Sequence, residues 1–103
     1  RKTLVGYVTL PNYRNYWRAC GHHEQIDAFE TILTESAKES RNAEIISAMD
    51  NEWLDDCTLS GDADTVRENL YDWSRLGVLP IAVMSSTSGG QAQAIGQLFE
   101  AFS

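Results

Sequence analysis

The sequence has few basic residues: 8 Lys and Arg stand against 15 Asp and Glu in 103 residues, which gives a net charge of −7. Contact with a nucleic-acid backbone requires clustered Lys and Arg, so this balance argues against nucleic-acid binding. No long apolar run is present, which argues against a membrane-spanning helix. The N-terminus also lacks the charged and then apolar pattern of a signal peptide. We therefore expect neither a nucleic-acid partner nor a membrane contact.

Cysteine and histidine are scarce as well, with two of each. Cys20 and Cys57 share no metal-ligand spacing, and neighbouring histidines point in different directions on a helix, so no metal site is predicted. Two unpaired cysteines suit a reducing compartment, and we expect a cytoplasmic protein. His22 and His23 can serve as acid or base near neutral pH, or simply complement the dipole at a helix end.

The length limits the chain to one small domain, because a complete (β/α)₈ barrel needs roughly 250 residues. The sequence begins at Arg1 without an initiator Met, which leads us to expect a trimmed or partial chain, although processing gives the same start. We find no internal repeat, low-complexity tract or linker.

Two apolar segments rich in β-branched residues predict strands. Residues 3–9 (TLVGYVT) precede Pro11, and residues 78–84 (VLPIAVM) carry Pro80 near their beginning. A very short strand or extended segment is expected at residues 57–59. The continuous apolar character suits parallel strands that are covered on both faces.

Helical periodicity fills most of the remaining sequence. Helices are expected near residues 12–21, 22–40, 43–49, 62–77 and 95–102. Asp62 is a suitable N-cap, and Gly77 is a suitable left-handed residue after the helix end. Strands separated by helices imply a parallel sheet with crossover connections. The expected fold class is therefore α/β, rich in helix, with two or three short parallel strands.

Residues 54–84 resemble a known family. A hydrophobic segment ends in Gly61, D-A-D-T-V-R-E-N-L follows, and a helix ends at L-G-V before an apolar strand. This order is similar to the last helix–strand unit of luciferase-like monooxygenases, in which G-T-P-E-E-V-x-E-x-L…A-G-V precedes the eighth strand. Asp62 stands where the family has Thr or Ser, and Ala63 where it has Pro; both fit a helix start. Residues 7–21 (YVTLPNYRNYWRACG) are similar to the family's seventh strand and the aromatic segment after it.

The resemblance implies that residues 1–103 are a single partial domain, the C-terminal fragment of a (β/α)₈ barrel that supplies its last two β/α units. The parent would be a flavin- or deazaflavin-dependent oxidoreductase or monooxygenase that uses FMN or a deazaflavin coenzyme. Most cofactor contacts would come from earlier strands. The fragment alone would hold no cofactor and show no turnover.

Active sites of such barrels lie at the C-terminal ends of strands, and two segments qualify. Tyr13, Arg14 and Arg18 follow the first predicted strand. The two arginines can clamp an anionic cofactor or substrate, or they can pair with nearby acids. Tyr13, with Tyr16 and Trp17, can line a ring-binding pocket or pack as the buried face of a helix.

The second segment is the loop after the last predicted strand, made of Ser85, Ser86, Thr87 and Ser88 before two glycines. Hydroxyl groups, accessible backbone amides and a helix N-terminus suit a phosphate or another anion. The alternative is a hydrated loop that caps the final helix, which the absence of Lys and Arg favours.

Two functions from different classes remain open. The first is a piece of a luciferase-like oxidoreductase that is inactive in isolation. The second is a small non-catalytic α/β module that self-associates or binds a protein partner. Open sheet edges and apolar helix faces predict a homo-oligomer, or association with the remainder of the barrel. No nucleophile has a neighbouring base, so we assign no catalytic residue.

Overall fold

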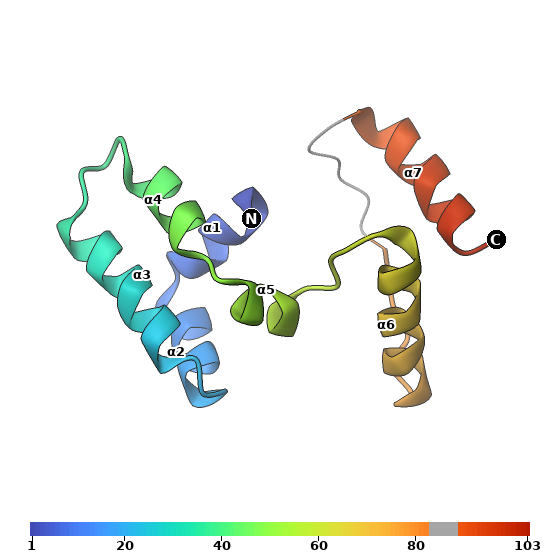
Figure 1. Ribbon diagram of the computed structural model, residues 1–103, viewed down its shortest axis with the longest axis horizontal. Coiled ribbons are helices and arrows are strands. Elements are labelled where there is room, and N and C mark those ends of the chain that lie inside the picture. The colour runs from blue at the N-terminus through green and yellow to red at the C-terminus, as the bar shows by residue number, and fades with distance from the viewer. Residues whose placement is uncertain (83–88) are drawn as a thin grey trace. The chain divides into compact units, whose positions relative to one another are not determined.

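The computed structural model describes residues 1–82 and 89–103, and these residues form seven α-helices and no strand (Figure 1). They belong to two compact units, which we call unit 1 (Arg1–Cys57) and unit 2 (Thr58–Ser103). The expected α/β class with two or three parallel strands is therefore wrong for the described residues. The TIM-barrel assignment that depended on it is wrong as well.

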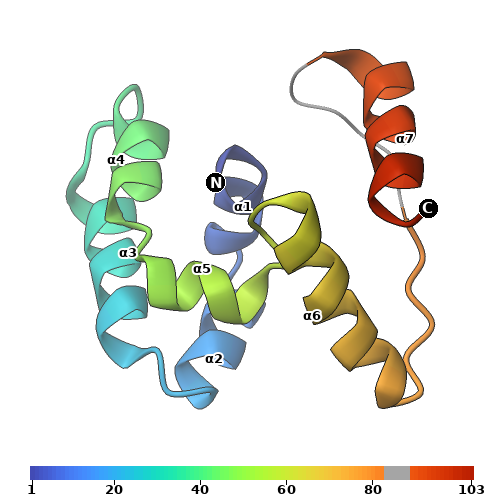
Figure 2. The ribbon, with the colours of Figure 1, turned by 45° about the vertical axis from the view of Figure 1, so that its right-hand side comes forward.

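Unit 1 consists of five helices around one apolar core. They are α1 (Lys2–Val8), α2 (Pro11–Ala19), α3 (His23–Glu35), α4 (Arg41–Ala48) and α5 (Asn51–Cys57). α3 packs on both α2 and α4, and α1 also packs on α2 and α4. Figure 2 shows α5 beside α2. The ring centroids of Trp53 on α5 and Trp17 on α2 lie 4.9 Å apart. The buried core residues are Val5, Val8, Trp17, Ile26, Phe29, Ile45, Met49 and Trp53.

The segment predicted as the first strand, residues 3–9, lies mostly in helix α1. Val5 and Val8 are buried, whereas Gly6 and Tyr7 between them are exposed. Burial at a spacing of three residues with an exposed opposite side is helical, while a strand in a parallel sheet is covered on both faces. A short apolar run fits either a strand or a helix. Here only one side of the segment packs on the core, which favours the helix.

Local signals define the ends of α2. Pro11 is the first residue of α2, where its fixed φ fits and its missing N–H is not needed. Gly21 follows the end of α2 with φ of 100°, a conformation that favours glycine. Gly21 lies in the turn between α2 and α3, which pack against each other.

A polar corner joins α4 to α5. Asp50 Oδ1 accepts a hydrogen bond of 2.7 Å from the backbone N–H of Trp53, which caps the start of α5. Arg1 donates to the carbonyl oxygen of Met49 at 2.5 Å and to that of Ile46 at 3.3 Å, at the end of α4. This corner directs Trp53 into the core of unit 1.

Unit 2 contains α6 (Ala63–Arg75) and α7 (Gly90–Ala101). Asp62 caps α6 as predicted, with Oδ1 accepting from the backbone N–H of Thr65 at 2.9 Å. Gly77 has φ of 79° just after the helix end, also as predicted. Neither helix contains a buried residue. The apolar side chains Val66 and Leu70 of α6 are only partly covered, and Trp73 is 50% exposed.

The two remaining strand predictions also differ from the structure. Residues 78–82 form neither helix nor strand, while residues 83 and 84 lie outside the described residues. Cys57 is the last residue of α5, and residues 58 and 59 have no regular structure. A strand is stabilised by pairing with another strand, and the described residues provide none.

Candidate functional site

The predicted site residues Tyr13, Arg14 and Arg18 all lie on α2. Tyr13 is at the edge of an aromatic series: its ring centroid lies 4.9 Å from that of Tyr7 and 5.9 Å from that of Trp17. Trp17 is buried, whereas Tyr7 and Tyr13 are exposed. Tyr13 therefore extends the core toward the surface.

The two arginines of α2 reach acidic side chains of α3. Arg14 Nε lies 3.4 Å from a carboxylate oxygen of Glu30, and its Nη1 donates to the carbonyl oxygen of Val8 at 2.9 Å. Arg18 contacts Asp27 at 2.6 Å and Glu30 at 2.9 Å. The hydrogen bond to Asp27 is the main reason that the pKa of Arg18 is raised further. An anionic ligand would have to compete with these carboxylates.

His22 makes a side-chain contact with Asp56 that the sequence did not predict. Its Nε2 lies 2.8 Å from Oδ2 of Asp56, and the His22 side chain is 12% exposed. This contact ties the N-cap position of α3 to α5. A His–Asp contact alone supplies two members of a catalytic triad and no nucleophile. Spacing gives no signal for a contact between residues 34 positions apart.

The thiols of unit 1 have different environments. Cys20 is exposed, while Cys57 packs against the core. Burial raises the pKa of the Cys57 thiol, which makes it a poor nucleophile at neutral pH. A hydrogen bond with Cys20 is the main reason that the pKa of Tyr16 is raised. The Cys57 thiol is therefore not activated for covalent chemistry.

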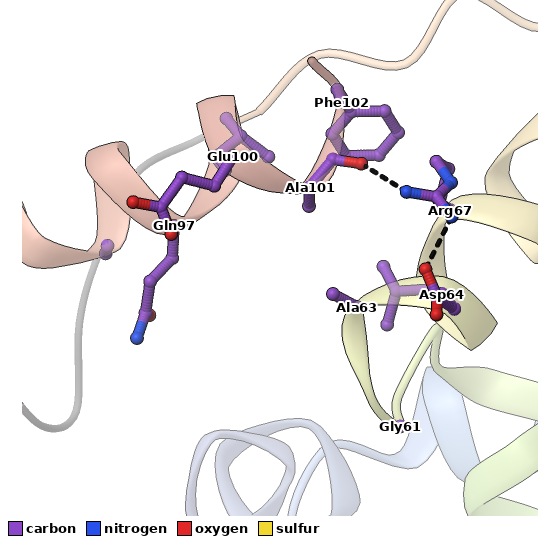
Figure 3. A pocket seen from close by; sticks show the side chains of 11 residues that line it. Gly61, Ala63, Asp64, Arg67, Gln97, Glu100, Ala101 and Phe102 are labelled. Carbon is purple, nitrogen blue, oxygen red and sulfur yellow. Dashed lines mark hydrogen bonds and ion pairs between the residues drawn. The ribbon is translucent and has the colours of Figure 1, made fainter.

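Unit 2 contains an open pocket of about 720 Å³ between α6 and α7. Figure 3 shows that Arg67 enters it from α6 and connects the two helices. Arg67 donates to the carbonyl oxygen of Ala101 at 3.0 Å and to Asp64 at 2.5 Å. The wall combines apolar side chains such as Leu98 with the acidic Glu100. Its only guanidinium is engaged, and no described residue of the pocket forms an acid–base pair with a nucleophile.

The second predicted site segment, Ser85, Ser86, Thr87 and Ser88, lies outside the described residues. Gly89, which follows it, is the N-cap of α7 with φ of 74° and makes no side-chain capping bond.

Three comparisons place no known protein beside this chain: no protein-family model, no curated protein and no solved structure matches it. Residues 1–82 and 89–103 contain no group of three or more His, Cys, Asp or Glu placed to hold a metal ion. Within the same residues, no helix is long and apolar enough to cross a membrane. The described part of the chain is thus a pair of small helical units whose polar side chains mainly satisfy one another.

Proposed function

We propose that this chain is a non-catalytic helical module that associates with a second copy of itself through the exposed apolar side chains of unit 2. The observation that carries the proposal is that α6 and α7 contain no buried residue. The large exposed hydrophobic residues of these helices and the segment between them are Tyr71, Trp73, Leu76, Val78, Leu79, Ile81, Ile95 and Phe99. We call them the apolar surface of unit 2.

The degree of exposure sets this surface apart from ordinary scattered surface residues. Leu76 is 77% exposed, Leu79 and Ile81 are each 82% exposed, and all three lie within six positions of one another. Burial of apolar surface contributes roughly 25 cal/mol per Å². An ordinary specific interface buries about 1,600 Å² in total. Large exposed apolar patches are typical of association sites.

The charge distribution supports contact between two copies. The chain carries a net charge of −7, but residues 76–99 include no Asp, Glu, Lys or Arg. Contact through this neutral stretch does not place like charges opposite one another, while the acidic remainder opposes unlimited aggregation. A closed two-fold dimer is the commonest result of such contact.

We also assign this module to the cytoplasm. Both cysteines are free, which suits the reducing cytoplasm. We assign the module no cofactor, nucleic-acid partner or membrane contact.

Sedimentation equilibrium at tens of micromolar tests the association. We expect a dimer or a larger closed oligomer, whereas an 11.5 kDa monomer throughout the concentration range would overturn the proposal. The informative variant is Leu79→Lys with Ile81→Lys, which should weaken association although it makes the net charge less negative. Electrostatic repulsion alone would predict the opposite effect.

Tyr16→Lys is the matched control. Tyr16 is 64% exposed but belongs to unit 1, so this change should leave the oligomeric state as it is. If Tyr16→Lys dissociates the oligomer and the double variant does not, the interface lies in unit 1 and the proposed surface is wrong.

A second candidate is a segment of a luciferase-like oxidoreductase, supported by the resemblance of residues 54–84. The observation in its favour is that the helix with this pattern begins after Asp62 and ends before Gly77, as the family pattern expects. A capped helix is common to many proteins, and residues 78–82 do not form the strand that the family pattern places after it, which is why this candidate ranks second. Its test is a titration of the longest natural protein that includes this sequence with flavin mononucleotide, followed by fluorescence. The 103-residue chain is the control that should not bind.

A further inference from the structure

Residues 78–82 have no backbone hydrogen bond to any other described residue. Among the described residues, no hydrogen bond uses an N–H or C=O group of this segment. Its sequence, VLPIA, combines β-branched and apolar residues, and it has no charge. Unpaired backbone groups next to exposed apolar side chains are a template for pairing with another chain.

We propose that residues 78–82 of two copies pair as antiparallel strands about a two-fold axis, with Pro80 opposite Pro80 of the second copy. This inference rests on the proposed self-association and assigns its contact and register. The strand forms between two chains only, which agrees with the absence of strands from the described residues of one chain.

Pro80 determines which side of the segment pairs. In a strand, the N–H and C=O groups of alternate residues point to opposite sides. The side of Val78, Pro80 and Ala82 lacks one donor, because proline has no N–H. The side of Leu79 and Ile81 has every donor and acceptor. Pairing therefore takes place along the Leu79–Ile81 side.

Antiparallel pairing uses this side in both copies. Leu79 of one copy and Ile81 of the other form a hydrogen-bonded pair that exchanges both bonds, and the two-fold axis repeats the pair. Pro80 then falls at the non-hydrogen-bonded position between the pairs, where a donor is not required. Parallel pairing in register would bond Leu79 and Ile81 of one strand to residues 78, 80 and 82 of the other, and would require the missing donor.

The same register gathers the most exposed side chains. Leu79 and Ile81 lie on one face of such a strand, and each is opposite the other residue type in the second copy. Apolar cross-strand pairs of this kind stabilise antiparallel pairing. A free sheet edge on a different protein could use the same donors, but the two-fold register needs only this chain.

Cysteine cross-linking tests the register in a background with Cys20→Ser and Cys57→Ser. Residues opposite each other at a non-hydrogen-bonded position have Cα atoms about 4.5 Å apart, which is within disulfide range. Pro80→Cys should therefore give a covalent dimer under mild oxidation. Leu79→Cys alone should cross-link poorly, because residue 79 of one copy lies opposite residue 81 of the other, two positions away from the second introduced cysteine. An equal mixture of Leu79→Cys and Ile81→Cys proteins should give the mixed dimer.

Tyr16→Cys in the same background measures collisional cross-linking. Thiols held together at millimolar effective concentration should react about a hundredfold faster than free thiols at tens of micromolar. Sedimentation of each variant before oxidation separates the two proposals. A dimer in which Pro80→Cys reacts no faster than Tyr16→Cys, or no faster than Leu79→Cys, would overturn the strand pairing and leave the association intact. Monomers throughout would overturn both.

Discussion

Gln25 on α3 and Asp50 at the start of α5 are joined by a hydrogen bond of 2.8 Å from the Asp50 backbone N–H to Gln25 Oε1. Nε2 of the Gln25 side chain donates to the carbonyl oxygen of Ala48, also at 2.8 Å. Gln25 is 6% exposed and is the only polar residue among the buried described residues. Its side chain satisfies both backbone groups at the corner between α4 and α5.

Gln25→Leu should destabilise unit 1, because it leaves the partly buried Asp50 N–H and Ala48 carbonyl without their side-chain partner. We expect a loss of about 1–3 kcal/mol in the free energy of unfolding, measured by urea titration with tryptophan fluorescence. Glu24→Leu, one position away on the exposed side of α3, should change it by less than about 0.5 kcal/mol. Equal effects of the two substitutions would show that the amide contributes nothing specific.

Arg14 and Arg18 should differ in their effects on stability. The Arg14 side chain is 15% exposed and donates to the end of α1 as well as to Glu30. Arg14→Ala should lower the free energy of unfolding by about 1–3 kcal/mol through the lost bond to a buried carbonyl. Arg18→Ala removes only more exposed ion pairs and should have a smaller effect. Thermal melts of both variants provide the measurement. If neither melting temperature moves, the ligand-clamp interpretation of these residues gains weight.

Helices with local signals at their ends were predictable from the sequence. Asp62 and Gly77 mark the two ends of α6 as expected. A side-chain cap and a left-handed glycine depend only on residues a few positions away, so the sequence is enough to predict them. The helix predicted for residues 22–40 instead ends at Glu35, where Ser36 is extended. Ser36 and Ser40 both donate to Glu44 of the next helix, and these bonds are the main reason that the pKa of Glu44 is lowered.

Segments whose structure depends on distant partners were not predictable. Residues 3–9 are apolar enough for a strand or a helix, and packing on one side of α1 decided between them. The sequence singled out Arg14 and Arg18 and left open whether they pair with nearby acids. It did not identify which acids these would be. Their partners Asp27 and Glu30 come from the crossing of α2 and α3. Contacts of this kind follow from tertiary packing and have no local pattern.

The cap of α6 should respond to acid. The hydrogen bond from the Thr65 N–H is the main reason that the pKa of Asp62 lies below its ordinary value of 3.8. A carboxyl whose pKa is lower in the folded state stabilises that state above its unfolded pKa, and this contribution is lost as the pH falls through the folded value. Helical circular dichroism should therefore decrease in this acid range. Asp62→Asn caps without a charge and should lack this part of the decrease, while Asp62→Ala should have less helix even at neutral pH. Identical acid titrations of the wild type and Asp62→Asn would contradict the assignment.

Trp53 should tolerate replacement by phenylalanine better than a buried tryptophan usually does. It is fully buried, and its ring centroid lies 4.9 Å from that of Trp17 and 5.1 Å from that of Phe29. Its indole N–H has no hydrogen-bond partner among the described residues. Trp53→Phe loses packing area and also removes an unsatisfied donor whose burial costs about 1–3 kcal/mol, so the two effects should largely offset each other. Trp53→Ala gains the same relief but leaves a large cavity, for which about 3–5 kcal/mol is typical. Phe29→Leu is the control, because it reduces a fully buried ring without removing a donor. In urea titrations we expect Trp53→Phe to be no more destabilising than Phe29→Leu; a loss as large as that of Trp53→Ala would mean that the indole N–H is satisfied in solution.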